Sequence, residues 1–302
     1  MTILILGSEG FIGGHCVDHF LATGHTVYGV DLYEQPSKKY HYTKIGRLSP
    51  EFEELFASKT FDAAINAAGS GNVPYSMTHP VADFEANCLD TIRLLDAIRR
   101  NQPACRYLHL SSAAVYGNPE KLPVREDDRL SPLSPYGAHK MLSEQLCREY
   151  HSLYALRTAM VRPFSVYGPG LKKQLFWDLY QKSMNTKGRI ELFGTGKESR
   201  DYIYVEDLVR GLDFILSKGK LEGEIYNLAS GEETSIEEAV VQFFTALRIK
   251  PDYYFNGHVR EGDPLNWRAD VSSMQKLGFS CKYGLPEGME RLAAWIRSLK
   301  TE

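Results

Sequence analysis

The chain has 302 residues and a formal net charge of −3, with 35 basic and 38 acidic residues mixed along it. This balance argues against nucleic-acid binding, and no apolar run approaches the ~20 residues that a membrane span needs. Five scattered cysteines without a Cys-x-x-Cys pair argue against disulfides or a zinc site. We expect a reduced, cytoplasmic protein without a metal site, built as two domains or one extended α/β unit.

Short apolar runs alternate with helical patterns through the first half of the chain. Strands are predicted at residues 2–6, 26–30, 63–66, 107–111 and 159–162, and helices at residues 11–23, 50–57, 81–100 and 135–154. Continuous apolar strands separated by helices are typical of a parallel sheet covered on both faces. The predicted fold class is therefore α/β, with a doubly wound parallel sheet of the Rossmann type.

The pattern changes after Arg162, where proline and glycine gather. Further helices are predicted at residues 204–216, 235–247 and 288–300, with a strand at 224–229. We expect residues 1–162, joined by 201–230, to form a dinucleotide-binding Rossmann domain. Residues 163–200 and 231–302 would then form a smaller C-terminal substrate domain.

A glycine-rich turn follows the first predicted strand. Gly7, Gly10 and Gly13 are spaced as G-x-x-G-x-x-G, and Phe11 and Ile12 begin the predicted helix. Glycines here permit a tight turn and a close backbone approach to a pyrophosphate, which the helix N-terminus attracts. The position between strand and helix makes this a dinucleotide-binding signature.

Asp31 ends the second predicted strand, 18 residues beyond Gly13. A carboxylate at this position accepts hydrogen bonds from an adenosine ribose and repels the 2′-phosphate of NADP. The alternative is an aspartate that caps a helix or forms a turn. Together with the glycines, Asp31 favours NAD as the cofactor.

Tyr136 and Lys140 form a Tyr-x-x-x-Lys pair at the start of a predicted helix. Residues four apart share a helix face, and a cation ~4 Å from a phenol contributes ~4 kcal/mol at an effective dielectric of ~20. We therefore expect Lys140 to lower the pKa of Tyr136 by as much as ~3 units, before desolvation takes some back. Ser112 follows a predicted strand, where open α/β sheets bind ligands, and its hydroxyl is placed to bind a substrate oxygen. The alternatives are a surface pair and a turn serine.

Several motifs together resemble one enzyme family. They are Gly7–Gly13, Asp31, Asn66–Gly69, Ser111–Gly117, Tyr136–Lys140 and Arg162–Gly170. In combination they are similar to the extended short-chain dehydrogenases/reductases, and specifically to the NAD-dependent epimerase/dehydratase family. The resemblance runs from Met1 to about Phe279.

The resemblance implies roles for the matching residues. Ser112, Tyr136 and Lys140 would be catalytic, and Lys140 would also hold the nicotinamide ribose. Beside the glycine loop and Asp31, the cofactor would contact Ala67, Ala68, Gly69, Asn87 and Pro163. The substrate, a nucleotide sugar, would contact Ser112, Tyr136, Ser165, Arg200 and Arg260. For the two arginines, which suit a diphosphate, the alternative is a surface ion pair with Asp201 or Glu261.

Three reactions occur on this scaffold: 4-epimerisation, 4,6-dehydration and reduction of a 4-keto sugar. Dehydration needs an acid and a base after the catalytic hydroxyl, but Ala113 and Ala114 stand there. NAD suits an enzyme that removes a hydride and returns it, so we predict C4 epimerisation of a nucleotide hexose through a transient 4-keto sugar. A reductase of a 4-keto sugar using NADH or NADPH is the alternative.

Two further expectations concern partners and class. Dinucleotide-binding regulators of this fold often lack the tyrosine or the lysine, so the presence of both argues for catalysis. The apolar patterns of residues 81–100 and 135–154 permit a helix-packed homodimer, as the family implies.

Overall fold

A seven-stranded parallel sheet forms the centre of the computed structural model, which describes residues 1–34, 39–47, 51–258, 262 and 264–299. The strands are β1 (Thr2–Leu6), β2 (Thr26–Asp31), β3 (His41–Lys44), β4 (Ala63–Asn66), β5 (Arg106–Leu110), β6 (Thr158–Pro163) and β11 (Glu222–Leu228). Their order is β11-β6-β5-β4-β1-β2-β3, and all neighbours pair in parallel. The chain changes direction beside β1, which creates a ligand crevice at the carboxyl ends of the strands.

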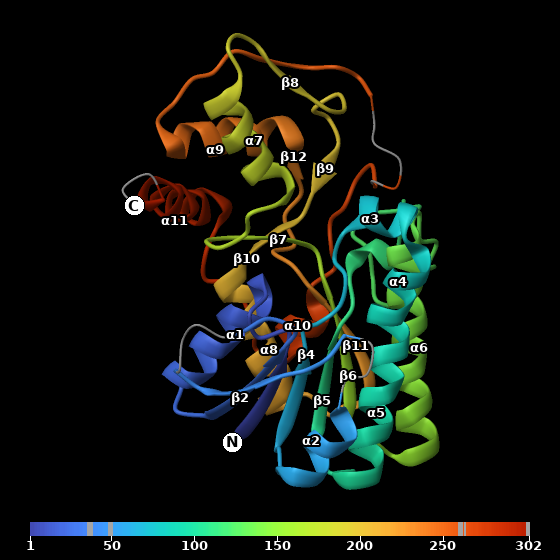
Figure 1. Ribbon diagram of the computed structural model, residues 1–302. Helices are drawn as coiled ribbons and strands as arrows, with labels where there is room; N and C mark the ends of the chain where they lie inside the picture. The colour runs from blue at the N-terminus through green and yellow to red at the C-terminus, as the bar shows by residue number, and fades with distance from the viewer. Residues whose placement is uncertain (35–38, 48–50, 259–261, 263, 300–302) are drawn as a thin grey trace.

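Helices cover both faces of the sheet, which confirms the predicted doubly wound α/β fold (Figure 1). One face carries α1 (Phe11–Ala22), α8 (Val205–Lys218) and the short α10 (Ser272–Lys276). The other carries α2 (Phe52–Ser58), α5 (Asp90–Asn101) and α6 (Pro135–Tyr154).

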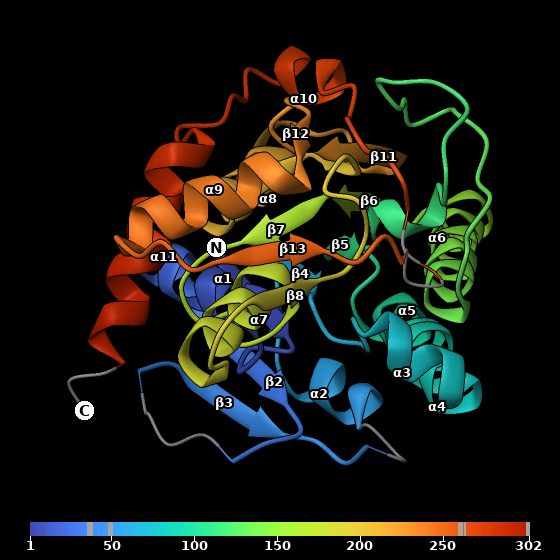
Figure 2. The ribbon, with the colours of Figure 1, turned by 90° about the horizontal axis from the view of Figure 1, so that it is seen from above.

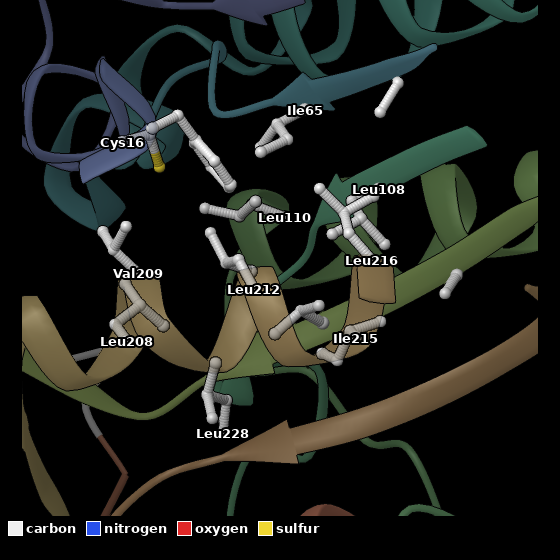
Figure 3. Close-up of a cluster of buried hydrophobic side chains, with 14 of the residues drawn as sticks. Cys16, Ile65, Leu108, Leu110, Leu208, Val209, Leu212, Ile215, Leu216 and Leu228 are labelled. Carbon is white, nitrogen blue, oxygen red and sulfur yellow. The ribbon is translucent and has the colours of Figure 1, made fainter. Parts of the chain in front are cut away.

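The two faces follow from the alternation of side chains along each strand. In β1, Ile3 and Ile5 enter the core beneath α1 and α8, whereas Leu4 and Leu6 enter the core beneath α2 and α5. Figure 3 shows the first of these cores, where α8 presents one apolar stripe to the strands. That stripe consists of Leu208, Val209, Leu212, Ile215 and Leu216. Burying each such side chain contributes about 1.5–3 kcal/mol.

Residues 165–204, 234–255 and 285–298 lie beyond the carboxyl ends of the sheet strands, toward the top of Figure 1. Three two-stranded sheets lie there: β7 (Ser165–Tyr167) with β10 (Tyr202–Tyr204), β8 (Ile190–Leu192) with β13 (Tyr253–Phe255), and β9 (Ser199–Arg200) with β12 (Thr234–Ser235). Helices α7 (Gln174–Asn185), α9 (Ile236–Leu247) and α11 (Leu285–Ser298) pack beside them (Figure 2). Phe176, Phe243 and Leu292 belong to a third apolar core within these segments. None of the helices in the described part of the chain has the length and hydropathy of a membrane span.

The structure differs from the sequence prediction in two places that border the site. Residues predicted as one helix, 81–100, form α4 (Pro80–Phe84), a π-helical turn (Glu85–Leu89) and α5, preceded by an unpredicted α3 (Val73–Thr78). A π-turn inserts one residue and shifts the apolar pattern by a single position, which the sequence prediction did not separate from a continuous helix. Strand β3 was not predicted either, because the edge sequence His41–Lys44 is polar and half exposed.

Candidate active site

The glycine loop joins β1 to α1 as the sequence predicts. Gly7 has a φ of +76°, and its amide donates to the Val30 carbonyl of the neighbouring strand at 2.8 Å. The amide of Gly10 donates back to the Gly7 carbonyl at 3.0 Å. Gly10 caps α1 without a side-chain acceptor, so the first-turn amides, beginning with Phe11 and Ile12, remain available to a phosphate.

The backbone around this loop is packed too closely for side chains. A Cβ on Gly13 would lie 1.9 Å from the Gly7 carbonyl oxygen, and one on Gly7 would lie 2.9 Å from Cα of Ala68. The loop therefore sits against Ala67 and Ala68, which follow β4. This cradle of bare backbone fits a dinucleotide, whose pyrophosphate needs close approach to amide groups.

Substituting Gly13 by alanine tests the cradle. We expect Gly13→Ala to weaken NAD affinity by about tenfold or more, since the loop must shift and a loss of 1.4 kcal/mol is tenfold. Gly14→Ala is the matched control, because its Cβ would meet only an ordinary contact, 3.6 Å from the Ser8 carbonyl oxygen. Calorimetric titration with NAD measures both, and equal affinities for the two variants would contradict the role of the loop.

Gly69, in the loop after β4, lies against Asn87. Gly69 has a φ of +118°, and a Cβ on it would be 2.6 Å from Oδ1 of Asn87. Asn87 lies in the π-helical turn and donates through Nδ2 to the carbonyls of Asp83 and Ser70. Its buried Oδ1 has no hydrogen-bond partner among the described residues. This unused acceptor also fits a bound polar ligand.

Asp31 ends β2 beside the glycine loop. Its side chain is buried, and Oδ2 accepts from the Glu9 amide at 2.9 Å, while Oδ1 accepts from the Leu32 amide. These bonds fix the carboxylate next to the loop. Its place fits the ribose contact that the sequence predicts.

Ser112 and Tyr136 are brought together by a tight junction between two elements. Ser112 caps a 3₁₀ turn (Ala113–Val115) by accepting from the Ala114 amide at 3.1 Å. At the start of α6, a Cβ on Gly137 would lie 2.6 Å from the Ala114 carbonyl oxygen, so helix and turn pack backbone to backbone. The Ser112 hydroxyl hydrogen-bonds the phenol of Tyr136.

Lys140 lies one turn further along α6 and is buried. Its Nζ donates to the Leu110 carbonyl oxygen at the end of β5, at a distance of 2.9 Å. Burial lowers the pKa of Lys140 to about 8, against an opposing effect of Asp83.

The expectation that the pKa of Tyr136 is lowered is wrong. Burial raises the pKa of Tyr136, the hydrogen bond from Ser112 lowers it, and Asp83 raises it again. The physical reason is that desolvation of the phenolate is the largest influence on its pKa, ahead of those of Ser112 and Asp83. Activation of Tyr136 therefore depends on what else occupies the site.

The predicted cofactor contact Pro163 ends β6. The predicted substrate contact Ser165 begins β7, opposite Tyr202 of β10. Arg200 in β9 donates through Nη1 to the carbonyls of Ser199 and Leu265, and its guanidinium lies 5.6 Å from the ring centre of Trp267. Arg260 lies outside the described residues.

Two buried pairs near the site were missed by the sequence reasoning. Arg162 of β6 donates to both carboxylate oxygens of Glu144, at 2.8 and 2.7 Å, and to the hydroxyl of Tyr116. Asp83 of α4 accepts from Nδ1 of His139 at 2.6 Å. The sequence indicates the pair of Arg162 and Glu144 only through the arginine inside the apolar run 159–163. It gives no sign of the pair of Asp83 and His139.

The predicted site residues that the structure describes thus gather at one edge of the sheet. The glycine loop follows β1, Asp31 ends β2, Ala67 follows β4, Ser112 follows β5 and Pro163 ends β6. Tyr136 and Lys140 reach this edge from α6. The arrangement combines a backbone loop that fits a dinucleotide with a serine, a tyrosine and a lysine that are suited to proton transfer.

Known proteins of similar sequence and structure agree with this geometry. Residues 3–229 match the model of the NAD dependent epimerase/dehydratase family. The chain is 30% identical to a putative UDP-glucose 4-epimerase of Methanocaldococcus jannaschii, over 98% of both chains. It is 29% identical to the UDP-glucose 4-epimerase of Mycolicibacterium smegmatis, over 99% of both.

A solved structure gives the same result. The UDP-glucuronic acid 4-epimerase of Bacillus cereus, in complex with UDP-glucuronic acid and NAD, superimposes with a TM-score of 0.90 at 26% identity. The match covers 99% of this chain and 100% of that one. The predicted family is confirmed: this chain belongs to the NAD-dependent epimerase/dehydratase family.

Proposed function

We propose that this chain is an NAD-dependent epimerase that inverts C4 of a nucleotide-activated hexose through a transient 4-keto sugar. The observation that carries the proposal is the convergence of Ser112, Tyr136 and Lys140 beside the glycine loop and Asp31. Relatives and structural neighbours named as 4-epimerases support it over the alternative of a 4-keto reductase.

NAD is the cofactor, and this chain offers it a continuous set of contacts. The amides at the start of α1 would hold the pyrophosphate, Asp31 the adenine ribose, and Lys140 the nicotinamide ribose. Ala67, Ala68, Gly69, Asn87 and Pro163 would line the remaining path. When bound, NAD would supply the acceptor and then the donor of the C4 hydride, so that epimerisation would involve no net redox change.

The chain's own residues handle the proton of the 4-hydroxyl. Tyr136 takes that proton when the carbonyl forms and gives it back when the carbonyl is reduced. Ser112 hydrogen-bonds the same oxygen, and the Lys140 ammonium would supply positive charge beside the phenolate once the site is occupied. Ala113 and Ala114 carry no titratable group, so these positions supply neither the acid nor the base of a dehydration.

The nucleotide end of the substrate would lie in the later segments. We propose that residues 163–200 and 231–302 form the substrate domain, and that residues 1–162 with 201–230 form the cofactor domain. Arg200 and Arg260 would contact the diphosphate, and Ser165 would contact the substrate beside them. A planar guanidinium pairs with phosphate through two hydrogen bonds, which supports this role for the arginines.

Oligomeric state and location complete the proposal. A homodimer packed through α4 and α6 is supported by apolar side chains exposed there, Val81 (71%), Phe84 (42%) and Leu142 (38%). A cytoplasmic location is supported by five free cysteines, of which four are buried.

The experiment uses the purified protein with UDP-, dTDP- and GDP-hexoses and trace NAD, followed by NMR of the anomeric protons. We expect the C4 epimer of one sugar nucleotide to appear without net consumption of the cofactor. Conversion of 4-keto sugars with stoichiometric NADH, and no epimerisation of any hexose, would establish the reductase instead.

A further inference from the structure

A buried carboxylate on α4 is hydrogen-bonded to the residue next to Lys140 on α6 and raises the pKa of that lysine. Asp83 is 0% exposed in α4, and its Oδ2 accepts from Nδ1 of His139, the residue that precedes Lys140. Its Oδ1 is buried and has no hydrogen-bond partner among the described residues. A carboxylate buried with one oxygen unbonded is costly unless a cation lies close by.

The titratable groups around Lys140 show which side chains there carry a charge at neutral pH. The titratable groups that face Asp83 or Lys140 are Tyr136, His139, Glu144 and Cys147 of α6, Cys88 of the π-helical turn and His109 of β5. Burial raises the pKa of Cys88 to about 11 and that of Cys147 further, and it lowers the pKa of His109 well below its usual value. These three groups are therefore neutral at neutral pH.

Glu144, the other carboxylate near Lys140, is already paired with an arginine. Glu144 binds Arg162 with both oxygens, at 2.8 and 2.7 Å. Among the described residues, Asp83 is thus the carboxylate with an oxygen left to compensate the Lys140 ammonium, whose Nζ has one hydrogen bond there, to the Leu110 carbonyl oxygen.

We propose that Asp83, oriented by His139, is the counter-charge of Lys140 and keeps its ammonium protonated inside the buried site. Asp83 and His139 are then positioning residues, which act through Lys140 and touch neither substrate nor cofactor. The catalytic consequence rests on the proposed epimerase function, whereas the charge balance does not.

The sign of the effect follows from the two neighbours of Asp83. Asp83 raises the pKa of Lys140, which burial lowers to about 8, and it also raises the pKa of Tyr136. Removing the negative charge destabilises the ammonium and favours the phenolate. Both limbs of a bell-shaped pH–activity profile therefore move to lower pH, a change that a merely structural role would not produce.

The direct test measures the titration of Lys140 by NMR of protein labelled with ¹³C and ¹⁵N in lysine, with Lys140→Arg to assign the signal. We expect a midpoint near 8 in the native sequence. Asp83→Asn is expected to lower it by about one pH unit or more, the usual size of the effect when a nearby opposite charge is lost. An unchanged midpoint in Asp83→Asn would overturn the proposal.

Two substitutions of His139 separate charge balance from packing. His139→Asn keeps a donor near the position of Nδ1, so we expect the native midpoint. His139→Leu leaves Asp83 without the donor that orients it, so we expect the midpoint of Lys140 to fall toward that of Asp83→Asn. A native midpoint in His139→Leu would show that His139 does not orient the counter-charge.

The same variants are then assayed for epimerisation across pH. We expect Asp83→Asn and His139→Leu to shift both limbs to lower pH, and His139→Asn to restore the native profile. If the native protein epimerises none of the sugars, the proposed function fails, but the lysine titration still decides whether Asp83 is the counter-charge.

Discussion

Tyr136→Phe is expected to lower kcat for epimerisation by about 10³-fold, because positioned acid–base groups contribute about 10²–10⁴. The substitution removes only the hydroxyl that exchanges a proton with the sugar. The ring and its packing at the start of α6 remain, so NAD affinity is expected to stay within a few-fold of the native value. Steady-state NMR assays of the C4 epimer and calorimetric titration with NAD measure the two quantities.

Tyr154→Phe is the matched control for this substitution. Tyr154 lies at the last turn of the same helix and is 46% exposed, and Arg99 packs over its ring at 5.0 Å. Loss of its hydroxyl should leave kcat unchanged. Near-native turnover of Tyr136→Phe would contradict the assignment of Tyr136 as the acid–base group.

Arg162→Met is expected to lower the free energy of unfolding by about 3–5 kcal/mol, the cost of leaving a buried charge without its partner. The side chains of Arg162 and Glu144 are 2% and 3% exposed. Arg162 also donates to the hydroxyl of Tyr116 at 2.7 Å and to the Glu126 carbonyl oxygen at 3.0 Å. Loss of the guanidinium therefore leaves the buried carboxylate of Glu144 on α6 without a partner. It also removes the hydrogen bonds from β6 to Tyr116 and Glu126. Urea denaturation measures the change.

Two further variants show that burial sets the size of this effect. The double substitution Arg162→Met/Glu144→Met removes both charges and is expected to recover part of the lost stability. Arg100→Met breaks the exposed pair with Asp96, where the arginine side chain is 58% exposed, and is expected to cost less than about 1 kcal/mol. A similar loss for Arg162→Met and Arg100→Met would exclude a structural role for the buried pair.

Much of the cofactor site was predictable because its chemistry is local in the sequence. The turn from Gly7 to Gly13 must be bare of side chains to pack against Ala68, and glycine is the residue that satisfies this. Asp31 was placed by counting from that turn to the end of the next strand. Tyr136 and Lys140 share a helix face, and their spacing alone puts them together.

The arrangement of Ser112 with Tyr136 needed the fold as well. Ser112 follows β5, whereas Tyr136 opens α6, and 23 residues separate them. The contact arises because Gly137 lets α6 pack directly on the turn that Ser112 caps. The resemblance to the family anticipated that pairing, but the spacing of the residues could not.

The sequence by itself determined the α/β fold, the glycine loop and the residues proposed to carry the chemistry, because periodicity and short motifs encode them directly. Tertiary structure alone decided the protonation of those residues and the partners that control it. Burial outweighs the nearby charges at Tyr136, and Asp83 lies 56 positions from His139 in sequence yet within hydrogen-bond distance. Both effects depend on solvent exclusion and on distances across the fold, which no local pattern of residues records.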